Sequence, residues 1–161
     1  MKGAMVGLLM FVVTLGFAQT EPVLFVYDEH TESLDRYIQW IKDELTDHQI
    51  AFEEAPAQEV GRRDLGKYRG LVVYSAVMAL NMKSPVRDWL SSGPKVGQKK
   101  VALLVTANRW FLDSLTNQQT KLLKQLDCRD VDVVTSATKD LDEAQKRALV
   151  KTFVDRISQR I

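Results

Sequence analysis

The chain has 161 residues with 22 basic and 21 acidic side chains, so its formal net charge at neutral pH is +1. This balance excludes the strongly basic surface that general nucleic-acid binding requires. The length suits one domain with its own core, and the single cysteine, Cys128, excludes an intrachain disulfide. We expect Cys128 to be a small apolar side chain buried beside a strand; a disulfide to another molecule is the alternative.

The first eighteen residues have the pattern of a signal peptide. Lys2 gives a positive start, residues 4–17 are uncharged and mostly apolar, and Gly16 and Ala18 are small residues where a signal peptidase cuts. We therefore expect cleavage before Gln19 and export, to a bacterial periplasm, of a single domain over 19–161 with no membrane span. An uncleaved N-terminal anchor is the alternative, although the run is shorter than the ~20 residues of a typical span.

Five short apolar runs predict buried strands, because strands covered on both faces are apolar throughout. Between them lie periodic segments of helical type. A stretch of mixed polarity over 53–64 predicts a loop with one helical turn. The strands are expected at 23–27, 50–53, 71–77, 101–106 and 131–135.

Capping residues and apolar spacing predict where the helices begin. Ser33 is expected to cap a helix that buries Leu34 to Leu45, and Pro85 starts a short helix that ends at "SSGP". Ser114 is expected to cap the next helix, and Asp140 or Asp142 the last. Strands that alternate with helices predict one three-layer α/β domain with a parallel sheet covered on both faces.

Three stretches resemble flavodoxin-like domains. They are "VLFVY" at 23–27, "LGKYRGLVVYSAVMALNMKSPVRDWL" at 65–90 and "GQKKVALLVTANRW" at 97–110. The resemblance implies a doubly wound five-stranded sheet of order 2-1-3-4-5. It also implies a flavin mononucleotide (FMN) site at the carboxyl ends of strands 1, 3 and 4.

The resemblance further implies which residues would contact a flavin. The phosphate loop would be 28–33, and loops 75–81 and 106–111 would flank the ring, with Trp110 or Phe111 stacked on it. The side chains implied as cofactor-binding are Thr31, Ser33, Ser75, Thr106, Asn108 and Trp110.

The first loop departs from the family pattern, because it has no glycine and contains Asp28, Glu29 and Glu32. A like-charge pair at about 4 Å costs about 4 kcal/mol at an effective dielectric constant of about 20. Attraction by a helix dipole recovers only about 0.3–2 kcal/mol. We therefore expect conventional FMN binding to be lost, with FMN binding as the alternative.

Other chemistry is less well supported by the pattern. Asp28, Glu29, His30 and Glu32 have oxygen and imidazole ligands for a divalent metal, but consecutive residues rarely converge on one ion, so we expect an acidic loop in solvent and no metal. Ser75 lacks the glycines of a nucleophile elbow, and no catalytic residue is assigned. A receiver domain would need an aspartate at the end of the third strand, where the sequence is "VVYSAV".

Two functions follow as hypotheses. One is an exported binding or interaction module that contacts a periplasmic protein or a small molecule through the crevice or through Trp110 and its neighbours. The alternative is an FMN-dependent electron-transfer protein with an atypical phosphate loop; any enzyme activity would then be that of a flavin-dependent oxidoreductase. Trp110 and Phe111 are either surface contacts or part of the core.

Overall fold

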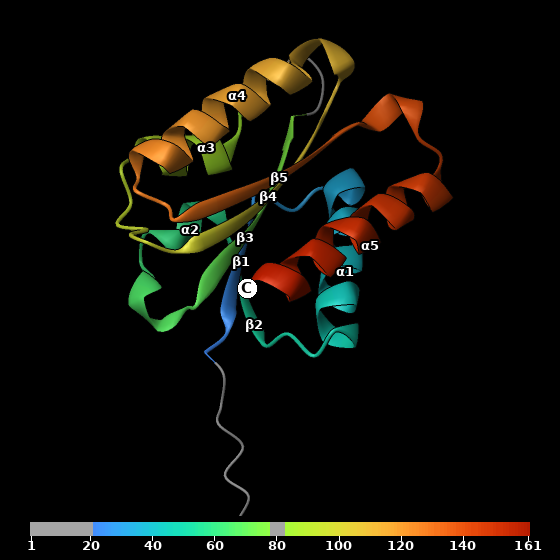
Figure 1. Cartoon of the computed structure of the whole chain (residues 1–161). Coiled ribbons are helices and arrows are strands. Elements are labelled where there is room, and N and C mark those ends of the chain that lie inside the picture. Colours follow the sequence, from blue (N-terminus) through green and yellow to red (C-terminus); the bar gives the residue numbers. More distant parts are fainter. Residues whose placement is uncertain (1–20, 78–82) are drawn as a thin grey trace, which may run out of the picture.

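The computed structural model describes residues 21–77 and 83–161, and its centre is a five-stranded parallel sheet of order β2-β1-β3-β4-β5 (Figure 1). The predicted fold class and strand order are confirmed. Each strand is short and mostly apolar, as parallel strands covered on both faces must be. The strands are β1 (Val23–Tyr27), β2 (Phe52–Pro56), β3 (Gly70–Val77), β4 (Lys100–Ala107) and β5 (Asp130–Ala137).

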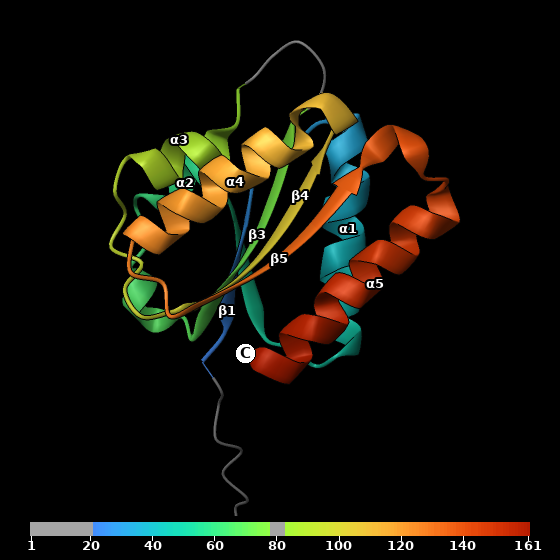
Figure 2. The same ribbon diagram turned by 45° about the horizontal axis from the view of Figure 1, so that its top comes forward.

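Helices cover both faces of the sheet (Figure 2). Two of them, α1 (Glu32–Asp47) and α5 (Glu143–Arg160), lie on one face, while α2 (Ala57–Val60), α3 (Pro85–Ser91) and α4 (Arg109–Gln125) lie on the other. Short 3₁₀ turns, η1 (Leu65–Lys67) and η2 (Thr138–Asp140), precede β3 and α5. This arrangement completes the three layers that the sequence predicts.

The alternation of side chains along β1 decides what faces each layer. Val23, Phe25 and Tyr27 pack in the core under α1 and α5, whereas Leu24 and Val26 pack in the core under α2, α3 and α4. The next residue in the second series is Asp28. Its carboxylate therefore points to the face that carries α3, away from α1.

Two predicted helix starts are wrong. Thr31, not Ser33, caps α1, since its hydroxyl accepts a hydrogen bond from the amide of Leu34, and Ser33 lies inside the first turn. Ser114 is an exposed residue inside α4, because that helix begins at Arg109, directly after β4 and Asn108. The last helix starts at Asp142, one of the two predicted positions, with a complete capping box.

The region after α1 also differs from the prediction. The second strand occupies Phe52–Pro56 and not 50–53, and one helical turn, α2, follows it directly. The predicted loop over 53–64 is thus shorter, because its first residues pair with β1.

Two predicted features lie outside the described residues. They are the signal peptide over 1–18 and most of the third-strand loop, 75–81. No helix within 21–77 and 83–161 is long and apolar enough to cross a membrane.

Candidate functional site

A buried carboxylate lies at the carboxyl end of β1. Asp28 is only 2% exposed and accepts four hydrogen bonds. One oxygen, Oδ2, accepts from the Ser75 hydroxyl at 2.9 Å and the Ala76 amide at 2.6 Å. The other, Oδ1, accepts from the Ser84 hydroxyl at 2.9 Å and the Val86 amide at 2.8 Å. Asp28 thereby joins β1 to the end of β3 and to the first turn of α3.

Gln119, on α4, completes this network. Its side chain is fully buried, and its Nε2 donates to Ser75 Oγ at 2.6 Å and to Ser84 Oγ at 3.3 Å. Each serine hydroxyl can therefore accept from the amide while it donates to Asp28. The result is one polar cluster, Asp28–Ser75–Ser84–Gln119, that links β1, β3, α3 and α4.

No cationic side chain of residues 21–77 and 83–161 pairs with Asp28. Burial raises the pKa of its carboxyl above the ordinary value, and the four hydrogen bonds, which favour the ionised form, oppose that shift. No lysine, arginine or histidine within the described ranges forms an ion pair with it. Among the described residues, the ionised carboxylate is therefore stabilised by hydrogen bonds alone.

A cleft of about 870 Å³ opens beside this cluster, between the start of α1, α2 and α3. Its charged lining residues are Asp28, Glu29, Asp88 and Lys83, so acids outnumber bases. The polar and apolar lining residues are Thr31, Ser33, Leu34, Ala57, Gln58, Gly61, Ala76, Pro85, Trp89 and Ser92. This volume is in the range of small-molecule sites, roughly 300–1,000 Å³.

The loop that leads into α1 forms hydrogen bonds with the elements on either side of it. The Thr31 carbonyl accepts from the amides of Leu34 and Asp35. The His30 ring lies between the Tyr27 hydroxyl, 2.8 Å from Nε2, and the Asp35 carboxylate, 2.7 Å from Nδ1. These hydrogen bonds hold the loop in one conformation although it contains no glycine.

Comparisons with solved structures find proteins that share this architecture. The chain resembles oxidised flavodoxin 2 from Bacillus cereus, with a TM-score of 0.67, 14% identity and coverage of 87% of this chain and 99% of that one. It also resembles the FMN-bound flavodoxin of Fusobacterium nucleatum, with a TM-score of 0.63, 10% identity and coverage of 87% and 98%. The fold is flavodoxin-like.

The same flavodoxin-like fold occurs inside a larger protein. Rubredoxin:oxygen oxidoreductase from Desulfovibrio gigas matches with a TM-score of 0.61 and 12% identity, over 87% of this chain but only 36% of that one. No model of a known family and no curated protein sequence matches the chain. At these identities the likeness establishes the architecture of the flavodoxin-like domain only.

The six residues predicted to hold a flavin do not gather in one place. Thr31 and Ser33 line the cleft, whereas Ser75 lies beneath it, bonded to Asp28. Thr106 is buried and hydrogen bonds the hydroxyl of Tyr74 at 3.1 Å, on the face that α1 and α5 cover. Asn108 and Trp110 are absent from the cleft lining, although they lie at the same edge of the sheet.

Trp110 is the most exposed large apolar side chain of the described residues, at 87%. It stands in the first turn of α4, where the sequence predicted a loop, and Phe111 beside it is half-buried. A contact surface was one of the two roles considered for this pair, and the exposure of Trp110 agrees with it.

Three residues of the site were missed by sequence reasoning. Ser84 stands immediately before Pro85 at a helix start, which is a recognisable N-cap pattern. Gln119 interrupts the apolar stripe of α4, four residues after Leu115 and four before Leu123. This position predicts a buried polar side chain with a hydrogen-bond partner. Trp89 lies on the apolar face of α3 and lines the cleft, and its apolar spacing alone predicts only a core position.

The structure also bears on metal binding and on Cys128. Among residues 21–77 and 83–161, no three histidine, cysteine, aspartate or glutamate side chains are grouped to hold a metal ion. Cys128 is half-buried against the core under α2, α3 and α4, and its thiol is free.

Proposed function

We propose that this chain is an exported flavodoxin-like binding module that no longer holds FMN in the conventional way. The observation that carries the proposal is the position of Asp28. Its carboxylate accepts the hydroxyl and amide hydrogens of Ser75, Ala76, Ser84 and Val86 at the edge where this fold carries its ligands. These four donors serve the protein's own anion and are not free for an anionic ligand.

The charges at the start of α1 support the same proposal. A phosphate dianion at this helix terminus would lie near Glu29 and Glu32, both exposed, with Asp28 beneath. Repulsion from one such charge, about 4 kcal/mol at about 4 Å, exceeds the helix-dipole attraction of at most about 2 kcal/mol. The cleft therefore suits a ligand without a phosphate.

The alternative function is an FMN-binding electron-transfer protein with an atypical phosphate loop. The size of the cleft and the FMN-bound flavodoxin from Fusobacterium nucleatum, as a structural neighbour, favour it. An enzyme activity would then be flavin-dependent oxidation or reduction. The two functions differ in one measurable property, the affinity for flavin.

The decisive experiment is a titration of the purified protein into FMN and, in parallel, into riboflavin, with flavin fluorescence as the readout. We expect no quenching of FMN up to high micromolar protein. Submicromolar quenching of FMN would overturn the proposal and establish the alternative.

A variant tests the stated reason for that result. Glu29→Gln with Glu32→Gln removes two charges near the start of α1 and should strengthen binding of FMN relative to riboflavin, which lacks the phosphate. Trp110→Ala is the control for stacking on the flavin ring. Because this side chain is exposed and does not line the cleft, the substitution should leave the affinity ratio of FMN to riboflavin unchanged. Equal changes for both flavins would contradict the electrostatic explanation.

The proposal also predicts where the binding partner lies and which surface it contacts. With export to a periplasm, the module would contact a periplasmic protein or a small molecule, through the cleft or through Trp110. An exposed tryptophan is a frequent energetic centre of protein contacts. Affinity capture from periplasm with the protein and with Trp110→Ala would identify a partner that depends on this side chain.

A further inference from the structure

The cleft has a charge and surface that select among ligand classes. Three of its four charged lining residues are acids, Asp28, Glu29 and Asp88, against Lys83 alone. Arg87 lies near Asp88 at 3.4 Å but does not line the cleft. The field in the cleft therefore favours a cation over an anion or a neutral molecule.

A second observation concerns Asp28 and is independent of Glu29 and Asp88. Asp28 is nearly fully buried in the cleft wall and has four dipolar donors but no cationic partner among the described residues. Burying an ionised carboxylate without a counter-charge costs free energy. A cation in the cleft would supply the missing counter-charge.

A third observation concerns Trp89, which lines this cleft and a smaller neighbouring hollow of about 430 Å³. The residue is 7% exposed, and its indole N–H, which has no hydrogen-bond partner in the part of the chain that is described, is a donor that an oxygen atom of a ligand could accept from. The indole ring adds a large apolar surface to the cleft wall. Leu34, Ala57 and Pro85 add apolar surface beside it.

We propose that the cleft binds an organic cation, an ammonium group on an apolar body, with the ammonium near Glu29, Asp88 and Asp28 and the body against Trp89 and Leu34. This inference rests on the proposed function, because it assumes that the cleft is not occupied by a flavin. The ligand class combines the charge of the lining with its apolar surface.

The test compares two probes of similar shape, phenethylammonium chloride and 2-phenylethanol, by two-dimensional ¹H–¹⁵N NMR of the whole protein. The indole resonance of Trp89, assigned with Trp89→Phe, reports binding at the cleft. We expect the ammonium probe to bind at least about tenfold more tightly than the alcohol, the ratio that one strong charge interaction gives. Equal affinities, or no shift of the Trp89 resonance at millimolar ammonium probe, would overturn the proposal.

Paired charge variants locate the interaction. Glu29→Gln with Asp88→Asn should remove most of the tenfold preference. Asp47→Asn with Asp113→Asn makes the same change in net charge at exposed residues outside the cleft and should keep that preference. An equal loss in both pairs would show a general charge effect and refute the assigned site.

The outcome is separable from that of the flavin titration. Tight flavin binding would refute the proposed function, whatever the cation result. Absence of flavin binding together with equal affinity for the two probes would refute only the cation site.

Discussion

At the scale of the residue, Asp28 explains most about this molecule. Sequence reasoning placed its charge in a solvated loop, but the side-chain alternation of β1 turns it inward, where two hydroxyls and two amides donate to it. A buried group with this many partners holds its neighbours in place, because each donor would otherwise lose its hydrogen bond to water. Asp28 thus has a structural role that an acidic loop residue lacks.

Replacement of Asp28 by alanine should therefore lower the free energy of unfolding. Donors on Ser75, Ala76, Ser84 and Val86 would lose their acceptor, and we expect a loss of about 2–4 kcal/mol. Glu29→Ala, which removes an exposed carboxylate from the next position, should change stability by no more than about 0.5 kcal/mol. Urea unfolding of both variants measures the difference; similar losses would show that the hydrogen bonds to Asp28 contribute little.

The raised pKa of Asp28 gives a dependence on pH. Because burial raises this pKa in the folded state above its ordinary value of 3.8, the folded protein binds the proton more tightly than the unfolded chain. The contribution of Asp28 to stability is then full below the ordinary pKa and falls as the pH rises through the folded-state pKa. We expect the free energy of unfolding of wild type to rise relative to that of Asp28→Asn as the pH is lowered from neutral towards about 4. Urea unfolding across this range tests it, and a difference that shrinks would reverse the sign of the shift.

Cys128 should be a slow nucleophile. Burial, with a smaller effect of the Asp127 charge, raises the pKa of its thiol to about 11. The reactive form is the thiolate, so alkylation by iodoacetamide at neutral pH should be about a hundredfold slower in the folded protein than in urea. Equal rates would contradict the shift. Slow reaction would also disfavour the disulfide to another molecule that the sequence left as an alternative.

At the scale of the element, α4 and α5 begin in different ways. The side chain of Asp142 caps α5 by accepting from the Gln145 amide at 2.8 Å, and the Gln145 side chain accepts from the Asp142 amide in return. The N-cap of α4, Asn108, makes no such side-chain hydrogen bond, and the first turn has no acid. The start of α5 is therefore stabilised by its own side chains, whereas the start of α4 has no side-chain cap.

Asp142→Ala should accordingly lower the free energy of unfolding by about 1 kcal/mol, the usual effect of losing an N-cap. Asp140→Ala, the other start predicted from the sequence, removes only an exposed ion pair with Arg109 and should cost less than about 0.5 kcal/mol. Thermal or urea unfolding of the two variants distinguishes them. The reverse order would assign the cap to Asp140.

These elements also show which parts of the fold the sequence predicts. Apolar runs such as 71–77 predict the strands, because burial on both faces leaves a simple apolar pattern. The start of α4 was missed because Ser114 imitates a cap, while the true N-cap, Asn108, has a side chain that bonds nothing in the helix. The site was missed because its members are far apart in the chain: Ser84 donates to Asp28 across 56 positions, and Gln119 donates to Ser75 across 44. One sequence does not show which distant polar residues meet.

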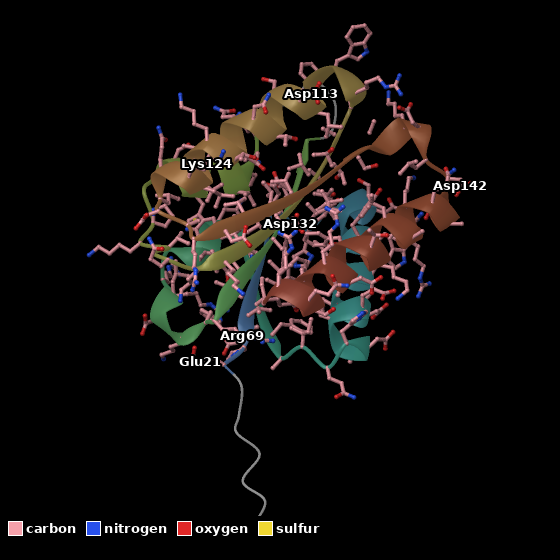
Figure 3. All side chains as sticks on the ribbon, viewed as in Figure 1. Glu21, Arg69, Asp113, Lys124, Asp132 and Asp142 are labelled. Carbon is pink, nitrogen blue, oxygen red and sulfur yellow. The ribbon has the colours of Figure 1, made fainter. Side chains whose placement is uncertain are left out.

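At the scale of the whole molecule, the candidate functional features gather at one end of the sheet. Figure 3 shows Glu21, where the described chain begins, at one end of the sheet, and Asp113 and Asp142 towards the other, where the strands finish. The cleft and Trp110 lie at the second end. The start of the described chain and the cleft therefore lie at opposite ends of the sheet.

The choice between removal and retention of residues 1–18 yields the last prediction. Gly16 and Ala18 stand at the positions that signal peptidase reads, so a protein expressed in a bacterium should be recovered from the periplasm with Gln19 as its first residue. Ala18→Arg should block processing and leave the intact chain on the membrane, since the peptidase accepts only small residues there. Phe17→Leu, at the intervening position, is the control and should be processed normally. Fractionation with mass spectrometry of the intact protein decides: wild-type protein intact on the membrane would establish the anchor, and intact wild-type protein in the cytoplasm would refute export.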